Sequence, residues 1–584
     1  MKTRPSALIL FCLVLGTLVP ALPASAATPP AGSTHTEVYF PSRDGTMLHG
    51  DLLKPTAGCP EGGCPVIVSI GPYYGRTTQG GVVPGVPPTT ASGPSNRFYD
   101  FINFNFPGKG NIFQQGYAWV QVDSRGYGVS GGCNDYGGPG EQMDAAAAVE
   151  WAAEQPWSNG KVGMWGKSYD AWTQVMALKM NPTALEAVVV QSPIIDGYGI
   201  AYVNGVHHDA LWYATTGLYQ LYDYGPPGPD QLGNPNVVYS LVGNSDRCWE
   251  KQHTYIAAGW DRDGLPSAEY WRQRDLRPAA SRNDDVAVLF SHGFNDINTK
   301  PDQIFPVYEP LNDLPKSNHR AWFGEWAHYR GNEANHTGRG GFLLEALDWF
   351  DHYLRGKPFA YGVNEKNVVE VQDQEGSWRT EAQYPPADVN EVSMPIRSGS
   401  YTDNNSQSAD AGYWTFSQPL EHDLRIAGEP EVTMTADVTA PWGNVIVVLY
   451  DHSGSEAKEI NRGAFRFEGD GPVTFKLHPR DHIVRAGHRL AVHVTSGHPQ
   501  FLPHQTNQPI AISNASIEIP FLTWERVINL GGRAASSTSR ELGKSFTATD
   551  QLTWPLPGPM TPYPTDDGGA TRESIQPTVT TPVP

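Results

Sequence analysis

The sequence predicts an α/β domain with a mostly parallel sheet, followed by an antiparallel β-sandwich. Two continuous apolar runs, 65–70 and 117–122, have the composition of strands that are buried on both faces. Such runs alternate with helix-compatible segments such as 142–154, which is the pattern of a parallel sheet with covering helices. Beyond about residue 368 apolar and polar residues alternate strictly between Gly- and Pro-rich turns, as in 432–438, which is typical of a sandwich.

The α/β domain is predicted to span residues 27–367, with a hairpin around the turn 42–45 at its start and a helix at 342–354 at its end. From 200 to 281 the alternation stops, and a segment rich in Tyr, Trp, Gly and Pro stands between sheet strands. This insertion is expected to form a helical cap over the active-site edge. The expected strands are 37–40, 46–53, 65–70, 117–122, 162–166, 187–190, 286–290 and 320–324.

The first residues have the composition of an export signal. Lys2 and Arg4 precede an apolar run at 7–19. An A-x-A cleavage signal follows at 24–26, so residues 1–26 are expected to be a signal peptide. The alternative is a membrane anchor, but the apolar run is too short to span a bilayer comfortably. The prediction is a secreted, extracellular protein without a membrane partner once the signal is removed.

Charge and composition limit the partners. The sandwich is expected to span residues 368–554, and the Pro- and Thr-rich segment 555–584 is expected to be a disordered tail. The formal net charge is −20, from 61 acidic and 41 basic residues. That balance argues against nucleic acid or an anionic membrane as a partner. The sequence has neither an HExxH motif nor clustered metal-ligand spacing, so no metal is expected.

Four cysteines remain after removal of the signal segment, which contains Cys12. An even number in an exported chain favours disulfides, and four cysteines allow three connectivities. Cys59 and Cys64 flank a short Pro-Glu-Gly-Gly loop and are expected to pair locally. Cys133 would then pair with Cys248. A zinc site is the alternative, but C-x4-C without a nearby histidine lacks the usual spacing.

The stretch 162–172 has the pattern of a strand, a sharp turn and the start of a helix, with Ser168 at the apex of the turn. In a nucleophile elbow this arrangement projects the serine hydroxyl above the sheet. Gly166, two residues before the serine, allows strand and helix to approach closely, whereas Asp170 stands where a second glycine is usual. Ser168 is therefore the candidate nucleophile.

A serine nucleophile needs a base and a group that orients the base. In α/β-hydrolases the acid follows the serine and the histidine comes last, each in a loop after a sheet strand. Asp296 follows the strand at 286–290, and His328 follows the strand at 320–324, so both fit this order. The weaker competitors are Asp123, Asp196, His292, His319, His336 and His352.

These motifs resemble the X-Pro dipeptidyl-peptidase and cocaine-esterase-like serine hydrolases of peptidase family S15, over about residues 37–550. The family's G-x-S-Y-x-G elbow is found at 166–171, with Ala171 in place of the final glycine. The resemblance implies an α/β-hydrolase domain, a jelly-roll C-terminal domain and no cofactor. The other shared motifs are the D-x-R-G-x-G-x-S-x-G stretch at 123–132, the P-Y turn at 72–73, the acid loop at 292–296 and the closing helix at 349–356.

The resemblance also implies an oxyanion hole. One donor would be the backbone N–H of Tyr169, and the other would be the phenol of Tyr73, with the adjacent Tyr74 as its rival. Such donors act on negative charge that develops in the transition state, and losing one costs about 10²–10³ in rate.

The leading hypothesis is an exported serine peptidase of the X-Pro dipeptidyl-peptidase type. In it Ser168 attacks the carbonyl, His328 acts as base and then as acid, and Asp296 orients His328. Lys167 and the loop 293–301 are similar to the X-Pro branch of the family. Such an enzyme must also bind a substrate ammonium and seat proline, for which the cap region offers acidic and aromatic residues: Asp196, Asp209, Asp223, Tyr198, Tyr202, Trp212, Tyr213 and Tyr222.

Two alternatives remain. The first is an esterase or amidase of the cocaine-esterase or α-amino acid ester hydrolase type, which would use the same three residues on a small ester substrate. The second is a carbohydrate- or surface-binding protein with a degenerate hydrolase domain, against which the complete triad speaks.

Overall fold

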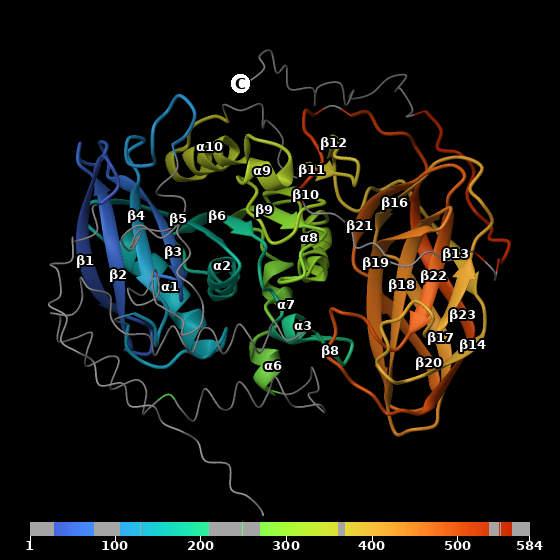
Figure 1. The fold of residues 1–584 in the computed structure, drawn as a ribbon. Helices are drawn as coiled ribbons and strands as arrows, with labels where there is room; N and C mark the ends of the chain where they lie inside the picture. The colour runs from blue at the N-terminus through green and yellow to red at the C-terminus, as the bar shows by residue number, and fades with distance from the viewer. Residues whose placement is uncertain are drawn as a thin grey trace, which may run out of the picture.

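The computed structural model describes residues 29–74, 105–128, 130–208, 248, 269–359, 368–528, 530–536, 548 and 551–562. They form an α/β domain and a β-sandwich domain that stand next to each other (Figure 1). This is the predicted fold class. The predicted signal segment 1–26 lies outside the described residues. Within the described residues, no helix combines the length and the apolar composition needed to cross a bilayer.

Ten strands form the sheet of the α/β domain, in the order β1-β2-β4-β3-β5-β6-β9-β10-β11-β12. The neighbours from β4 to β11 in this order are parallel, and the pairs at both edges are antiparallel. The strands are β1 (Ser33–Pro41), β2 (Met47–Pro55), β3 (Cys64–Gly71), β4 (Ala118–Asp123), β5 (Ser158–Lys167), β6 (Leu185–Gln191), β9 (Ala287–Gly293), β10 (His319–Gly324), β11 (Val368–Gln372) and β12 (Trp378–Glu381).

Helices cover both faces of this sheet, which explains why β3 and β4 are buried along their whole length. Val66 and Val68 of β3 belong to the apolar cluster that contains α1 (Pro139–Ala153) and α2 (Tyr169–Met180). Ile67, between them, points to the other face and joins the cluster of α10 (Phe342–Arg355). Further short helices are α7 (Arg277–Ala280), η2 (Pro301–Gln303), α8 (Phe305–Leu311) and α9 (Ala334–Thr337).

Two strands of the segment that is predicted to form the sandwich belong to the first sheet. They are β11 and β12, which extend the first sheet: Arg320 of β10 pairs with Val368 of β11, and β12 pairs with β11. The sandwich strands begin only at Val389. All five residues of β11 are buried, so both faces of this strand are covered, as in the central strands of the first sheet.

Two antiparallel sheets form the sandwich. One contains the order β20-β17-β23-β16-β21, with β13 and β14 also paired to β23, and the other has the order β15-β22-β18-β19. The predicted alternation in β17 is confirmed, because its buried residues are every second one. The strands are β13 (Val389–Ile396), β14 (Gly399–Thr402), β15 (Tyr413–Phe416), β16 (Leu424–Gly428), β17 (Glu431–Val438), β18 (Gly443–Ser453), β19 (Glu456–Phe467), β20 (Gly471–Lys476), β21 (Arg480–Val484), β22 (Arg489–Thr495) and β23 (Pro509–Leu522).

The insertion at 200–281 lies mostly outside the described residues, which here are 200–208, 248 and 269–281. Its start contains the end of α3 (Gly197–Ala201) and a two-stranded hairpin of β7 (Tyr202–Val203) and β8 (Val206–His207); α6 (Glu269–Gln273) stands near its end. Val203 and Val206 of the hairpin pack on apolar residues of the sandwich. The described start of the insertion therefore bridges the two domains.

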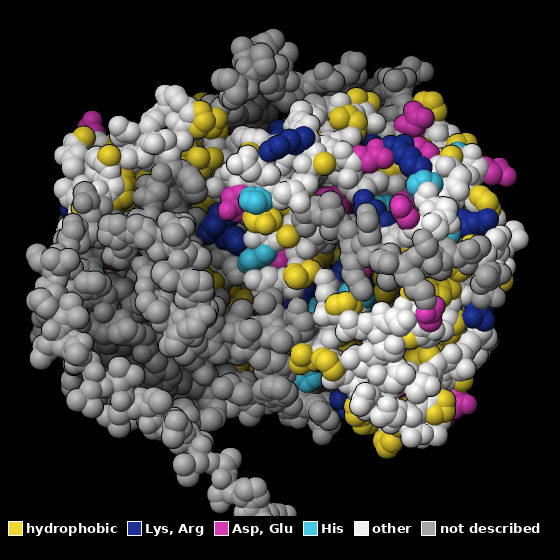
Figure 2. Space-filling model, in the orientation of Figure 1, with side chains coloured by type: hydrophobic (Ala, Val, Ile, Leu, Met, Phe, Trp, Pro, Cys, Tyr) yellow, Lys and Arg dark blue, Asp and Glu magenta, His cyan; other side chains and the backbone are white. Residues whose placement is uncertain are grey.

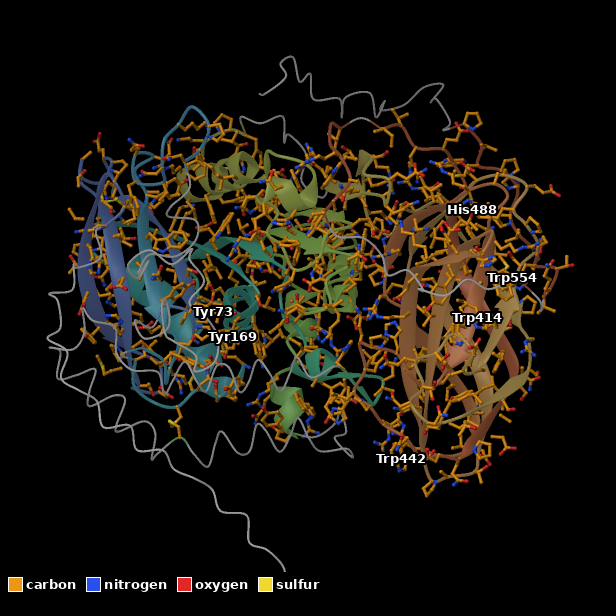
Figure 3. All side chains as sticks on the ribbon, viewed as in Figure 1. Tyr73, Tyr169, Trp414, Trp442, His488 and Trp554 are labelled. Carbon is orange, nitrogen blue, oxygen red and sulfur yellow. A yellow bond between two sulfur atoms is a disulfide. The ribbon has the colours of Figure 1, made fainter. Side chains whose placement is uncertain are left out.

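The predicted tail does not begin at residue 555. Trp554 is buried in the sandwich core, where Figure 3 labels it, and Leu556 packs against the same core. Thr561 donates its backbone N–H to the carbonyl of Thr523 at 3.0 Å. A Pro-rich segment can pack as an extended chain against a sheet, and composition alone does not reveal that contact. Residues 563–584 lie outside the described part of the chain.

Candidate active site

Ser168 stands between β5 and α2, as the N-cap residue of the helix, with φ of 63° and ψ of −120°. A positive φ is strained for a non-glycine residue and is a feature of nucleophile elbows. The serine is half-buried. Gly166 is required by the close approach of strand and helix, because a Cβ there would lie 2.4 Å from the Cβ of Asp170. Ala171, which departs from the family pattern, is fully buried without disturbing the turn.

His328 and Asp296 meet through a hydrogen bond of 2.7 Å between Nδ1 and Oδ2. The carboxylate can only accept, so Nδ1 carries the proton and Nε2 is left as the basic nitrogen. Burial alone would raise the pKa of Asp296, but the imidazole of His328 and the backbone N–H of Asn298 hold it well below its usual range. Burial lowers the pKa of His328, and Asp296 opposes that shift only in part.

The elbow is connected to the loop that carries His328 by one direct hydrogen bond and by two more that run through Gln191. Lys167 Nζ donates to the main-chain carbonyl of His328 at 2.8 Å. The carbonyl of Gln191, at the end of β6, accepts from the N–H of Ser168 at 3.0 Å. The side-chain oxygen of the same Gln191 accepts from the N–H of Gly331 at 2.9 Å. Ser168 and His328 are thus held at the same edge of the sheet.

The loop after β3 separates the two candidate tyrosines. Tyr74 is buried, and its hydroxyl donates to Asp170 Oδ2 at 2.5 Å, while Ser69 Oγ lies 2.6 Å from the same hydroxyl. Tyr73 is half-buried and follows β3, which is parallel to β5, so it stands at the edge that carries Ser168. Tyr74 thus serves as a brace between the loop and the elbow helix, which leaves Tyr73 as the better oxyanion candidate.

Tyr169, which Figure 3 labels, immediately follows the serine and is anchored by its phenol hydroxyl. Its hydroxyl donates to the carboxylate of Glu141, at 2.7 and 2.8 Å from the two oxygens, and accepts from Asn134 Nδ2 at 3.1 Å. Burial and the charge of Asp135 raise the pKa of Glu141 to about 8. The backbone N–H of Tyr169 belongs to the first turn of α2, where the helix itself supplies no acceptor. The anchored ring fixes the position of that N–H.

The competing histidines and acids have other contacts. His292 is buried with its Nε2 3.9 Å from Asp296, and burial lowers its pKa to about 4. Asp123 accepts from His49 Nδ1 at 2.8 Å. The other three histidines are bound elsewhere: His319 to Ser317 and Asn312, His336 to Ser536 with its ring on Tyr329, and His352 to the carbonyl of Lys357.

The described part of the predicted aromatic wall is a packed cluster. Tyr198 and Tyr202 stack with ring centroids 4.8 Å apart, and both meet Trp271 edge to face. Asp196 caps α3 through the N–H of Tyr198 and forms an ion pair with Arg277 at 3.3 Å. Asp196 is therefore engaged within the fold. The other proposed pocket residues, Asp209, Asp223, Trp212, Tyr213 and Tyr222, lie outside the described residues.

Sequence reasoning missed several residues that support the candidate triad. Thr299 donates its hydroxyl to Asp296 Oδ2 at 3.0 Å, and its N–H donates to Oδ1 at 3.1 Å. An aspartate whose side chain accepts from backbone N–H groups two or three residues later is a common turn motif. The contact between Thr299 and Asp296 could therefore have been predicted from the sequence. Glu141 and Gln191 carried no local signal, because their partners lie far away in the sequence.

Both predicted disulfides are present. Cys59 is bonded to Cys64, and Cys133 is bonded to Cys248. Among the described residues, Glu37, His49 and Asp51 form a group whose ligand atoms lie within 4.8 Å of one another and could hold a metal ion. This group is on β1 and β2 at the far edge of the sheet. It is separated from β5 by β4 and β3 and takes no part in the site around Ser168.

The geometry agrees with comparisons to known proteins. A family model described as X-Pro dipeptidyl-peptidase (S15 family) matches residues 44–330, and one described as X-Pro dipeptidyl-peptidase C-terminal non-catalytic domain matches residues 362–538. The chain belongs to the S15 peptidase family. As an S15 member it is a serine hydrolase with an α/β-hydrolase domain, as expected from the sequence.

The relatives are distant. A Bacillus cereus protein with the provisional name Xaa-Pro dipeptidyl-peptidase is 23% identical over 448 residues, which is 66% of this chain and 72% of that protein. The Xaa-Pro dipeptidyl-peptidase of Lacticaseibacillus casei is 24% identical over 484 residues, but this S15 chain spans only 59% of its length. A solved α-amino acid ester hydrolase has 19% identity and a TM-score of 0.61, covering 87% of this chain and 99% of its own, which shows the shared fold.

Proposed function

We propose that the protein is an exported Xaa-Pro dipeptidyl-peptidase that works through an acyl-enzyme. The observation that supports this most directly is the 2.7 Å hydrogen bond between His328 and Asp296 at the same sheet edge as the strained Ser168. The role follows from the chemistry: a neutral His328 Nε2 is the base that a serine hydroxyl requires.

The proposed reaction has two halves. The hydroxyl of Ser168 attacks the carbonyl carbon of the proline, and its proton passes to His328 Nε2. The oxyanion is stabilised by the N–H of Tyr169 and the phenol of Tyr73. His328 then gives the proton to the leaving amine, and water resolves the acyl-enzyme by the reverse sequence. Asp296 remains ionised and stabilises the imidazolium, in keeping with its lowered pKa.

The peptidase is favoured over the esterase by the names of the relatives and by two local features. Lys167 before the serine and the loop 293–301 are similar to the X-Pro branch of the family. The alternative is an esterase or amidase, as in the α-amino acid ester hydrolase of the same fold. The three residues of the triad would have the same roles, and only the substrate would differ.

A matched substrate panel tests the choice. We expect cleavage of H-Ala-Pro-p-nitroanilide and a rate at least tenfold lower for the N-acetylated compound, because losing a charge-assisted contact costs roughly 1.5–3 kcal/mol. The Ser168→Ala variant serves as the blank. If both anilides are inert while p-nitrophenyl esters are hydrolysed well, the esterase alternative is correct. Equal rates on free and blocked anilides would indicate a peptidase that does not recognise the N-terminus.

Export is part of the proposal and has its own test. It rests on the charged and apolar segments and the A-x-A signal within residues 1–26. The formal charge of −20 and the interspersed acidic and basic side chains on the face shown in Figure 2 fit a protein that binds neither nucleic acid nor an anionic surface. N-terminal sequencing of protein from the culture medium should start near Ala27. Retention in the cell with an intact N-terminus would contradict export.

A further inference from the structure

The side chain of Arg480 links the sandwich domain to the candidate active site. Arg480 is the first residue of β21 and is almost fully buried. Its Nη2 donates to Asn295 Oδ1 at 2.6 Å, and its Nη1 lies 3.4 Å from Glu325 Oε2. Asn295 directly precedes Asp296, and Glu325 stands three residues before His328. One guanidinium from the second domain thus contacts both loops that carry the candidate acid and base.

The two loops are also joined to each other at this point. Asn295 Nδ2 donates to the carbonyl of Glu325 at 2.7 Å and to its Oε2 at 3.0 Å. The N–H of Asn295 donates to the carbonyl of Trp326 at 3.1 Å. The side-chain amide of Asn295 cannot flip to exchange its oxygen and nitrogen. Its oxygen faces a guanidinium, which only donates, and its nitrogen faces carbonyl and carboxylate oxygens, which accept. Arg480 therefore fixes the Asn295 side chain that links the loops.

We propose that Arg480 is a positioning residue for the hydrolase reaction: from the sandwich it holds the Asp296 loop and the His328 loop so that the carboxylate meets the imidazole. The proposal rests on the proposed function, since it needs Asp296 and His328 as acid and base. It gives the sandwich a role in catalysis. A planar guanidinium suits this role because its fork can contact two acceptors at fixed angles, which an ammonium cannot do.

A simpler role for Arg480 must be separated from this one. Glu325 is buried, and burial raises its pKa to about 7 although Arg480 opposes the shift. Arg480 would stabilise the fold merely by neutralising that carboxylate, and breaking a buried pair is costly whatever its function. The two roles differ in what happens when both charges are removed together.

The experiment compares Arg480→Met with Arg425→Met in the full-length protein. Arg425 is a matched control: it is buried in the same domain, and it bonds across to Asp373 at 2.9 Å and to Asp481. It touches neither the Asp296 loop nor the His328 loop through any contact that the described residues show. Both variants should lose thermal stability. Only Arg480→Met should lose kcat, by about tenfold to a hundredfold, with KM changed less than threefold, because small misplacements of catalytic groups have such effects.

The pH profile provides a readout that lost stability would not change. The charge and hydrogen bond of Asp296 raise the pKa of His328 against the lowering effect of burial. A loosened contact should therefore move the acid limb of kcat/KM to lower pH in Arg480→Met and leave it in place in Arg425→Met. Labelling of Ser168 by a serine-directed phosphonate should slow in parallel with kcat.

The double variant Glu325→Gln with Arg480→Met keeps the test decisive if the single variant does not fold. It removes both charges of the pair between Arg480 and Glu325, so its stability should recover, while kcat should stay at least tenfold low. Recovery of kcat together with stability would overturn the proposal, as would a folded Arg480→Met with kcat within threefold of the parent, or equal losses in both arginine variants. The proposed function is judged by a separate result: if the serine-directed phosphonate does not label the parent protein at Ser168, the proposed function is wrong, whatever the arginine variants show.

Discussion

The ammonium of Lys167 donates a hydrogen bond to the main-chain carbonyl of His328 at 2.8 Å. The residue before the candidate nucleophile thus holds the backbone of the candidate base. Its positive charge also lies close enough to the imidazole to oppose protonation, adding to the effect of burial. Lys167 therefore influences both where His328 stands and when it is neutral.

Lys167→Met should raise the pKa of His328, because a nearby cation disfavours the imidazolium. Activity requires the neutral imidazole, so the acid limb of kcat/KM should move to higher pH, and kcat at neutral pH should fall several-fold. Lys161→Met is the control, since Lys161 lies on the same strand but pairs with Glu186 at its exposed end. The measurement is the pH profile of kcat/KM for both variants. An unshifted limb in Lys167→Met would contradict this role.

Ser168→Ala should abolish turnover while the protein stays folded, because a half-buried hydroxyl at a turn adds little to packing. A serine-directed phosphonate should label the parent at Ser168 alone, which peptide mapping by mass spectrometry can establish. Labelling of a different serine, or substantial activity left in the variant, would refute the assignment of the nucleophile.

Asp296→Asn should reduce kcat by about 10⁴, the size of effect expected when the orienting acid can no longer select the imidazole tautomer. An amide in this position offers a donor where Nδ1–H needs an acceptor. Thr299→Val, which removes one hydrogen bond to the same carboxylate, should cost far less and serves as the comparison. Steady-state kinetics on the preferred substrate measures both. Similar losses of kcat in the two variants would mean that both substitutions act by disturbing the loop, and would contradict a specific role for the Asp296 carboxylate.

Tyr73→Phe should lower kcat by about 10²–10³ with little change in KM, as expected for the loss of one oxyanion donor. Tyr74→Phe should cost at most about tenfold, because its hydroxyl braces Asp170 and does not face the reacting carbonyl in our assignment. The comparison is made on one activated ester, so that acylation is measured directly. A larger loss of kcat in Tyr74→Phe than in Tyr73→Phe would identify Tyr74 as the oxyanion donor.

Local patterns in the sequence were sufficient to predict the triad candidates and most of the first sheet. Ser168 is identified by a strand, a glycine and a helix within eleven residues, and Asp296 and His328 by their places in loops after predicted sheet strands. Each of these signals lies within one element, where periodicity and turn chemistry act directly. The structure places the three residues at one sheet edge for the same reason, since parallel strands end together.

The parts that the sequence did not predict depend on contacts between distant segments. The hydrogen bonds of Glu141 to Tyr169 and of Arg480 to Asn295 join residues far apart in the chain. The local sequence around one partner does not predict the other. The same limit applies to β11, which the sequence assigned to the sandwich segment and which pairs with β10 of the first sheet. Pairing is a tertiary property, and alternation records only which face is buried.

The two disulfides should differ in their effect on stability. Cys133–Cys248 closes a separation of 115 residues and Cys59–Cys64 one of 5. The loss of loop-closure entropy predicts about 4–5 kcal/mol of stabilisation for the long loop and roughly 2 kcal/mol for the short one. For each disulfide, both cysteines are replaced by serine and the variant is unfolded in urea. Where the dependence of the unfolding free energy on urea concentration keeps the same slope, the shift in midpoint gives the difference in the free energy of unfolding. Thiol titration of the parent under denaturing, non-reducing conditions should find no free sulfhydryl among Cys59, Cys64, Cys133 and Cys248. Two or more free sulfhydryls among them would contradict the closure of both bonds.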